Sequence, residues 1–263
     1  MGVLNVTPDS FSDGGMFLRK ADAIRRSAEM VKAGADIIDV GGESTRPLAK
    51  DISAEAQMAR VLPVIAALAK DLSVPISIDT RKAGVAAEAM KAGASIINDV
   101  SGLRHDPEMA QVAAKYRAAV ILMHMRSSPK DMQSKAVYRD VVRDVIKELR
   151  HSIKLAKAAG IKDGAIIIDP GIGFSKTVNH NLQILNRLQE FKMLNRPICI
   201  GTSRKSFIGK ILNKPDERDR LIGTIATSVI GIINGANIIR VHDVAEAKEA
   251  SRMTDTVLRG ANA

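Results

Sequence analysis

The sequence predicts an α/β protein, a single (β/α)8 barrel domain over residues 1–263. Short apolar runs alternate with amphipathic stretches along the whole chain, as in parallel strands covered by helices. Eight such runs occur, one about every 34 residues, which is close to the size of one βαβ unit. The length of 263 residues also suits one barrel of about 250 residues. An open doubly wound sheet stays the alternative, because the number of strands does not prove closure.

The expected strands are short β-branched runs, most of them ending in a polar residue. Three of them share one pattern, in which a helix ends at a glycine and a strand follows at once: residues 33–39, 92–98 and 234–240. Gly34, Gly93 and Gly235 stop these helices, because a helix commonly ends at a residue with positive φ. We expect the eight strands to end near Asn5, Asp39, Asp79, Asn98, Met123, Asp169, Gly201 and Arg240.

The expected helices lie between these strands. In residues 141–153 apolar side chains recur at steps of three and four, with charged residues on the other face. Similar stripes cover residues 18–33, 53–70, 82–92, 178–191 and 243–259. The uncharged stretch 221–239 contains too many Gly and Asn residues for a membrane span. We expect there a buried helix, a turn at Asn234–Gly235 and a strand over Asn237–Val241.

Composition narrows the range of partners. The chain has 39 Lys and Arg against 29 Asp and Glu, a net charge of +10, which predicts an anionic partner. The basic residues are scattered, and Trp is absent, so a phosphorylated small molecule fits at least as well as a nucleic acid. A single cysteine, Cys199, suits a reducing compartment, and the first residues do not resemble a secretory signal. We therefore expect a cytoplasmic protein with no membrane or nucleic-acid partner.

Polar residues at the strand ends are the first candidates for chemistry. In a barrel they meet at one mouth, where barrel enzymes have their active sites. The set contains Asn5, Asp39, Asp79, Asn98, Asp169, Arg240 and His242. Residues 7–15 (TPDSFSDGG), 41–47 (GGESTRP) and 201–206 (GTSRKS) add hydroxyls and cations, and the last segment begins a helix, which suits an anion. His124 is either a core residue or a site residue.

Several of these segments together resemble the motifs of the dihydropteroate synthase family. MGVLNVTPDSFSDGG at 1–15 and DIIDVGGESTRP at 36–47 are similar to its two pterin-binding signatures. The likeness continues in order through residues 77–80, 94–102, 121–125, 167–174, 201–209 and 239–243. The resemblance implies a barrel enzyme of folate biosynthesis that condenses 6-hydroxymethyl-7,8-dihydropterin pyrophosphate with p-aminobenzoate. It also implies Mg²⁺ as cofactor, a homodimer and a sulfonamide target.

The same resemblance implies a role for each matching residue. The pterin would contact Asp79, Asn98, Met123, Asp169, Phe174, Lys205 and Arg240. The pyrophosphate would contact Asn5, Thr45, Arg46, Arg240 and His242, with Asn5 also a ligand of Mg²⁺. The p-aminobenzoate pocket would contain Phe11, Pro47, Lys205 and Ser206. The catalytic set would be Asp13, Arg46 and Lys205, with Asp13, held by Arg46, closing over a carbocation that forms when the C–O bond to pyrophosphate breaks.

Two other functions compete with this interpretation. A pterin-binding methyltransferase of the methyltetrahydrofolate–corrinoid type would share the Asp and Asn contacts to the pterin. It would make no use of a pyrophosphate site, so the joint presence of residues 7–15, STRP at 44–47 and SRKS at 203–206 argues against it. A basic nucleic-acid-binding protein is the third possibility, and salt-dependent retention of DNA would favour it.

Overall fold

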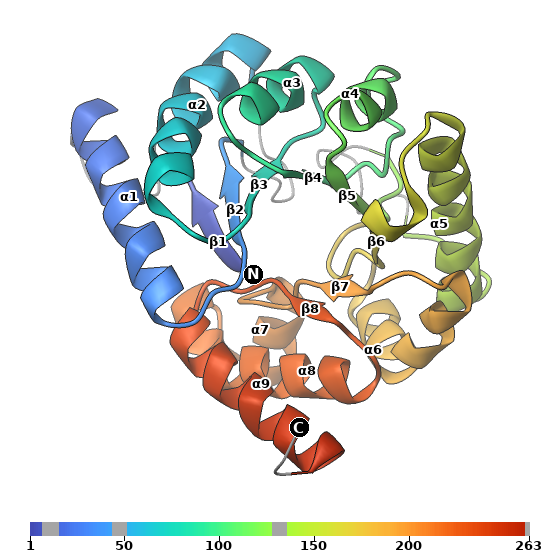
Figure 1. Cartoon of the computed structure of the whole chain (residues 1–263). Helices are drawn as coiled ribbons and strands as arrows, with labels where there is room; N and C mark the ends of the chain where they lie inside the picture. The colour runs from blue at the N-terminus through green and yellow to red at the C-terminus, as the bar shows by residue number, and fades with distance from the viewer. Residues whose placement is uncertain (7–15, 44–51, 128–135, 261–263) are drawn as a thin grey trace.

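Eight parallel strands form a ring that helices surround in the computed structural model, which describes residues 1–6, 16–43, 52–127 and 136–260 (Figure 1). The strands are β1 (Gly2–Asn5), β2 (Ile38–Gly41), β3 (Ile76–Asp79), β4 (Ile96–Asp99), β5 (Ala119–Met123), β6 (Ile166–Asp169), β7 (Cys199–Ile200) and β8 (Ile238–Ile239). Strands β1 to β6 pair in chain order as one parallel sheet, and β7 pairs with β8. The predicted strand ends are correct to within two residues, although β8 is shorter than expected.

Two single bridges close the ring. Ile168 at the end of β6 pairs with Ile198 just before β7, and Gly2 in β1 pairs with Val241 just after β8. The amino group of Met1 donates to the carbonyl oxygen of Ile239 at 3.1 Å, across the same seam. The barrel is therefore closed, as predicted, and the open doubly wound alternative is excluded.

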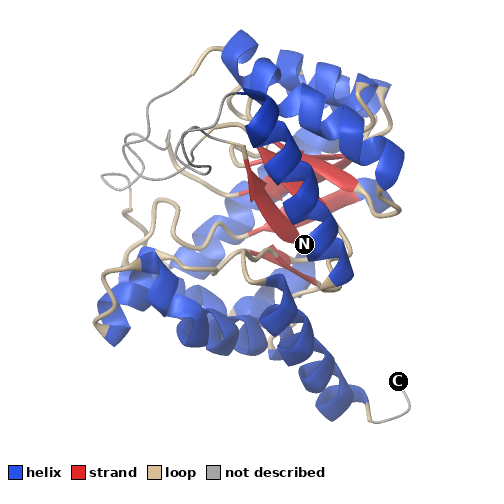
Figure 2. Cartoon of the chain, turned by 90° about the vertical axis from the view of Figure 1, so that its left-hand side faces the viewer, coloured by secondary structure: helices blue, strands red, loops and turns tan. Residues whose placement is uncertain are grey.

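The helices lie outside the strands (Figure 2). They are α1 (Met16–Lys32), α2 (Ala54–Asp71), α3 (Ala83–Lys91), α4 (Met109–Lys115), α5 (Val141–Ala158), α6 (Val178–Asn186), α7 (Ser206–Leu212), α8 (Leu221–Ile233) and α9 (Val244–Arg259). In the described residues, 3₁₀ turns follow three of the helices: η3 (Asp163–Ala165), η4 (Leu188–Leu194) and η5 (Glu217–Arg220). The stripe predicted over 178–191 is divided between α6 and η4, and α4 is missing from the predicted stripes.

The three repeated turns have the predicted conformation. Gly34, Gly93 and Gly235 have φ values of 96°, 111° and 104°, in the left-handed region that favours glycine. At Gly93 a Cβ atom would lie 2.5 Å from the Cβ of Ala69, so this turn also lets the end of α3 pack directly on α2. Each strand then begins within a few residues of the glycine.

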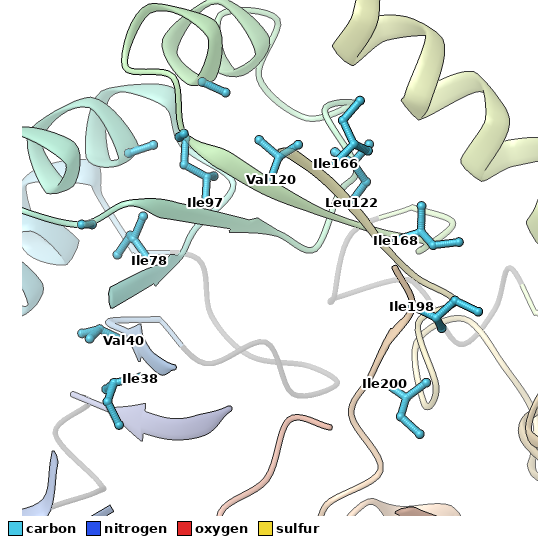
Figure 3. Close-up of a cluster of buried hydrophobic side chains, with 14 of the residues drawn as sticks. Ile38, Val40, Ile78, Ile97, Val120, Leu122, Ile166, Ile168, Ile198 and Ile200 are labelled. Atoms are coloured by element: carbon cyan, nitrogen blue, oxygen red, sulfur yellow. The ribbon is translucent and has the colours of Figure 1, made fainter. Parts of the chain in front are cut away.

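Side chains of the strands alternate between the helices and the inside of the ring. The outward residues pack with the helices in one large core, and Figure 3 shows ten of them: Ile38, Val40, Ile78, Ile97, Val120, Leu122, Ile166, Ile168, Ile198 and Ile200. Ile96, Ile121 and Cys199 form a separate inner cluster with Met1. Cys199 is a free, buried thiol, as predicted for a small apolar side chain, and burial raises its pKa.

Helix α8 differs from its prediction as a buried helix. Its buried residues are small, Gly223, Thr224, Ser228 and Gly231, and they let the helix lie close to the barrel. A Cβ at Gly231 would lie 2.1 Å from the Cδ1 of Ile200. The opposite face is open, with 78% of Ile222 exposed. In the part of the chain that the structure describes, no helix is both long and apolar enough to cross a membrane.

Candidate active site

Four acidic or amide side chains lie at the inner, carboxyl-terminal end of the ring. Because side chains alternate along a strand, the residues between the outward Ile and Val residues point inward. Near the ends of β2, β3, β4 and β6 the inward residues are polar: Asp39, Asp79, Asn98 and Asp169. All four are buried. The predicted convergence of polar strand ends is therefore confirmed for these strands.

Arg240, directly after β8, ties this group together. Its Nε lies 2.6 Å from Asp39 Oδ2, and its Nη2 lies 2.9 Å from Asp79 Oδ2. Asn98 Nδ2 donates to the same Asp39 oxygen at 3.1 Å. Groups from β2, β3, β4 and the end of β8, up to 201 residues apart in the chain, thus share one network.

The carboxylates of this network have spare acceptor capacity. Asp39 Oδ1 and Asp79 Oδ1 are buried and have no hydrogen-bond partner among the described residues. Burial raises the pKa of Asp79 to about 7, as do the negative charges of Asp39, Glu43 and Asp99, against the opposing charge of Arg240. A buried acceptor left unpaired costs about 1–3 kcal/mol, so a ligand that supplies N–H donors would recover that free energy.

Asp169 forms the opposite wall of the mouth. Its Oδ1 accepts a hydrogen bond from the backbone N–H of Gly171 at 2.7 Å. Burial raises the pKa of Asp169, and the positive charge of Lys205 is the largest influence against it. Burial lowers the pKa of Lys205 to about 8, opposed by the negative charge of Asp169. Lys205, directly before α7, and Asp169, at the end of β6, therefore stabilise each other's charged form.

The Lys205 side chain lies across the loop that follows β6. Its ammonium donates to the carbonyl oxygen of Ile172 and lies 4.6 Å from the centre of the Phe174 ring. Gly173, with φ of 84°, makes room for it, because a Cβ there would lie 2.9 Å from Lys205 Cδ. A glycine between two predicted site residues therefore has a packing role of its own.

A small apolar cluster completes the mouth beside Lys205. Val100, Met123 and Met125 are buried together, and the Phe174 ring packs against them. The sequence analysis predicted Met123 and Phe174 but not Val100 or Met125. Each of these two lies two residues past a predicted residue, Asn98 or Met123, so continuing the alternation beyond the strand end would have found them. A flat aromatic ligand suits an apolar surface of this kind.

Of the residues predicted for pyrophosphate, the described ones, Asn5, Arg240 and His242, lie on the side where the ring closes. Asn5 ends β1, and a Cβ at Gly41 would lie 3.5 Å from Asn5 Oδ1 and 3.9 Å from Asp79 Oδ2. His242 Nδ1 lies 2.9 Å from Ser203 Oγ, and this oxygen also accepts from the His242 backbone N–H at 3.2 Å. Ser203 was not among the predicted contacts, although it belongs to the GTSRKS segment. Ser206 is exposed at the start of α7.

Other predicted residues lie outside the described part of the chain. These are Phe11 and Asp13 in the first loop and Thr45, Arg46 and Pro47 in the second. Within the described residues, no group of three or more His, Cys, Asp and Glu side chains is arranged to hold a metal ion. His124 is fully buried, and its ring lies against Glu148 of α5.

Comparisons with known proteins agree with this geometry. The family model "Pterin binding enzyme" matches residues 1–242. The dihydropteroate synthase of Clostridium beijerinckii is 50% identical over 260 residues, which cover 98% of this chain and 94% of that protein. A crystal structure of the Clostridium difficile dihydropteroate synthase in the presence of pteroic acid has a TM-score of 0.93 and 48% identity, over 98% of this chain and 96% of that one.

A second similar structure is described with 7,8-dihydropteroate bound. The Xanthomonas albilineans dihydropteroate synthase in complex with 7,8-dihydropteroate has a TM-score of 0.90 and 37% identity, over 98% of this chain and 93% of that one. Both the strand-end network and the full-length similarity thus point the same way. The chain belongs to the pterin-binding enzyme family and, within it, to the dihydropteroate synthases, which are transferases of folate biosynthesis.

Proposed function

We propose that this chain joins 6-hydroxymethyl-7,8-dihydropterin pyrophosphate to p-aminobenzoate at the mouth formed by Asp79, Asn98, Asp169 and Lys205. The observation that carries the proposal is the group of buried acceptors opposite an apolar surface. A pterin is flat and has adjacent N–H donors along one edge. Asp39 Oδ1 and Asp79 Oδ1 are buried acceptors without a partner among the described residues, and Asp169 lies on the facing wall.

In this proposal Asp79, Asn98 and Asp169 bind the polar edges of the pterin. Lys205 donates to its acceptor atoms, while Met123 and Phe174 pack against the ring. Arg240, held by Asp39 and Asp79, presents a planar guanidinium that can stack on an aromatic face. Asp79 and Asp169 accept N–H donors best when ionised, so binding is expected to weaken as the pH falls.

The pyrophosphate would lie towards Asn5, Arg240 and His242, and Thr45 and Arg46 would complete its contacts. Asn5 Oδ1 would lie 3.5 Å from a Cβ at Gly41, at the mouth, and would be the protein oxygen that binds a cation there. Mg²⁺ prefers oxygen ligands and keeps several waters, so one amide oxygen together with substrate phosphates fits it. When bound, Mg²⁺ would neutralise charge on the leaving pyrophosphate.

The proposed reaction is dissociative. The C–O bond to pyrophosphate breaks, the electron pair leaves with pyrophosphate, and the dihydropterin ring delocalises the cation that remains. Asp13, held by Arg46, would stabilise that cation. The arylamine of p-aminobenzoate, held by Lys205 and Ser206 with Phe11 and Pro47, then attacks and loses a proton. A strong general base is unnecessary because the attacking amine is neutral.

A coupled assay tests the proposal. Purified protein with both substrates and Mg²⁺ should release pyrophosphate and form dihydropteroate in equal amounts, and removing p-aminobenzoate or adding a chelator should stop both. Lys205→Met should lower kcat/KM at least about 100-fold. Lys210→Met, at an exposed lysine of α7, the helix that follows Lys205, is the matched control. Methyl transfer from methyltetrahydrofolate without dihydropteroate formation would favour the corrinoid alternative instead.

We also propose that the protein is a homodimer, joined through an apolar face of α7, α8 and α9. The exposed apolar residues there are Ile211, Leu212, Ile222, Ile230, Ile233, Met253, Val257 and Leu258. Patches of this kind on a folded protein commonly mark an interface. Light scattering of the parent protein should give twice the mass of one chain. The double variant Ile222→Lys, Val257→Glu should give the mass of a single chain. A monomeric parent protein would contradict the proposal.

Residues 1–263 are proposed to act as one domain in the cytoplasm. The closed ring, with Gly2 paired to Val241, supports the single domain, and the unpaired, buried Cys199 is compatible with a reducing compartment. Limited proteolysis that released a stable half of the chain would contradict the single domain.

A further inference from the structure

Lys176 is a buried lysine outside all the residues assigned so far. It lies between β6 and α6, two residues after Phe174, and only 3% of it is exposed. Its Nζ lies 2.9 Å from the carbonyl oxygen of Phe174, 3.0 Å from His124 Nδ1 and 3.4 Å from the His124 carbonyl oxygen. In the residues that the structure describes, no carboxylate lies within ion-pair distance of it. Three acceptors around one nitrogen match the three N–H groups of an ammonium.

His124 is the group that Lys176 contacts most specifically. Its other ring nitrogen, Nε2, lies 2.9 Å from Glu148 Oε2. A carboxylate only accepts, so Nε2 carries the proton and Nδ1 has the lone pair that faces Lys176. Burial and the nearby Lys176 charge lower the pKa of His124 to about 3, which keeps the ring neutral. Glu148 also accepts from Arg126 Nε at 2.9 Å. A series of contacts through His124 and Glu148 thus connects the Lys176 ammonium to α5.

The loop that Lys176 ties down is the one that orients Asp169. The backbone N–H of His124 donates to the Asp169 carbonyl oxygen at 2.9 Å, which joins the ends of β5 and β6. Gly171, whose N–H binds the Asp169 carboxylate, has φ of 70° and passes so close to the His124 carbonyl oxygen that a Cβ would lie 1.9 Å from it. Lys176 therefore contacts both sides of the junction that positions Asp169.

Lys176 also acts on Asp169 through its charge. Burial raises the pKa of Asp169, and three cations oppose that increase: Lys205, then Lys176, then Arg240. Burial in turn lowers the pKa of Lys176 well below its usual value, and Asp169 is the largest opposing charge. The other charged or titratable groups that face this pair are Glu148, Arg126, His124, His180 and Cys199. Asp169 thus lies between a cation at the mouth, Lys205, and one behind it, Lys176.

We propose that Lys176 is a positioning residue for pterin recognition, whose buried positive charge holds Asp169 in the carboxylate form that accepts the pterin N–H donors. Lys176 contacts the backbone of Phe174 but no side chain proposed to bind the pterin, and it acts through Asp169. The proposal rests on the proposed function, because it assigns Asp169 to the pterin. It accounts for a lysine that is buried at a cost and surrounded by acceptors rather than by a carboxylate.

The pH dependence of pterin binding tests this role. The probe is 6-hydroxymethylpterin, which lacks a leaving group, and its Kd is measured by calorimetry between pH 5 and 9. Lys176→Gln retains N–H donors but has no charge, and Lys176→Met has neither. Without the charge, Asp169 binds its proton at a higher pH. We therefore expect the acid-side loss of affinity to begin about one pH unit higher in both variants, which is about tenfold in Kd on that limb.

A second set of variants separates the effect of Lys176 on Asp169 from any effect on Asp79. Asp79 titrates in the same range because burial raises its pKa to about 7. In Asp169→Asn, substitution of Lys176 should leave the remaining pH profile unchanged. Lys157→Gln, an exposed lysine of α5, is the control for loss of a surface charge. Thermal unfolding and circular dichroism show whether each variant is folded, and Lys176→Gln keeps the test valid if Lys176→Met does not fold.

Two results would overturn the proposal. An acid limb at the wild-type position in Lys176→Gln would show that the charge has no effect on Asp169. A shift that persists in the Asp169→Asn background would show that Lys176 acts through another group. If the wild-type protein binds the pterin but forms no dihydropteroate, the proposed function fails while the role of Lys176 is still measured by Kd.

Discussion

Strands β1 to β6 and strands β7 and β8 contribute to the same ring in different ways. The first six pair continuously in registers of three or four residues. The last two pair over two residues and join the others through single bridges. Helix α5 buries a long apolar face, whereas α8 buries only small residues and exposes large ones. The continuously paired part, β1 to β6, therefore carries the buried carboxylates. The part with short pairing, β7 and β8, is followed by Lys205, Ser206, Arg240 and His242.

This division suits the proposed reaction, in which the pterin stays bound while pyrophosphate leaves. Asp79, Asn98 and Asp169 end well-paired strands, so the proposed pterin contacts are held in place without ligand. Lys205, Ser206, Arg240 and His242 follow the short strands β7 and β8, where the backbone has fewer ladder hydrogen bonds, whereas Asn5, also proposed for pyrophosphate, ends β1. Arg240 connects the two parts, because it follows β8 while its two partners, Asp39 and Asp79, lie in β2 and β3.

The largest effect is therefore expected at Arg240. Arg240→Met leaves Asp39 and Asp79 buried without their cation, and breaking such a pair costs about 3–5 kcal/mol of unfolding free energy. The kcat/KM should also fall about 100-fold or more, as for removal of a transition-state donor. Urea unfolding and the coupled assay measure the two effects. Arg259→Met, an exposed arginine of α9, should change neither.

A matched pair of core substitutions compares the two parts of the ring directly. Ile97→Ala in β4 removes a fully buried side chain and should cost about 2–5 kcal/mol. Ile238→Ala in β8 removes a half-buried side chain and should lower the free energy of unfolding by about half as much. Urea unfolding of both variants gives the comparison. Equal losses would mean that β7 and β8 are as tightly held as β4.

The smallest expected effect concerns pH and Asp79. Because its pKa is raised to about 7 in the folded state from an ordinary 3.8, the folded protein binds a proton that the unfolded chain has lost. The stability that this group contributes is present below about pH 4 and is lost as the pH rises through 7. Asp79→Asn should thus be more stable than the parent by about 1–2 kcal/mol at pH 8, with the gap closing towards pH 4. A gap that widens towards acid would contradict this assignment.

Much of the fold could be predicted because strand ends and helix ends have local signals. Gly34, Gly93 and Gly235 have the expected positive φ, and Asp79, Asn98 and Asp169 end their strands where the polar residue follows the apolar run. Helix α4 escaped prediction because seven residues are too few for a clear stripe. Helix α8 has no charged residue on any side, so its periodicity could not tell which face is open.

The site was predicted less completely for a different reason. Polar strand ends could be found one at a time, but Ser203 belongs to the site through the path of a loop, and Val100 and Met125 lie just beyond the strand ends. Lys176 is further removed, because its role depends on His124 and Asp169, which are brought to it only by the pairing of β5 with β6. The roles of Phe11, Asp13, Thr45, Arg46 and Pro47 stay predictions.

The seam between Gly2 and Val241 has a consequence for how the protein is made. During synthesis the early strands leave the ribosome long before their last neighbour exists, so β1 must wait with an unpaired edge until residue 241 has emerged. Such distant pairing is intrinsically slow. We therefore expect the nascent chain to expose this strand edge until the final strand arrives, and its yield in a cell to depend on how well the edge is shielded.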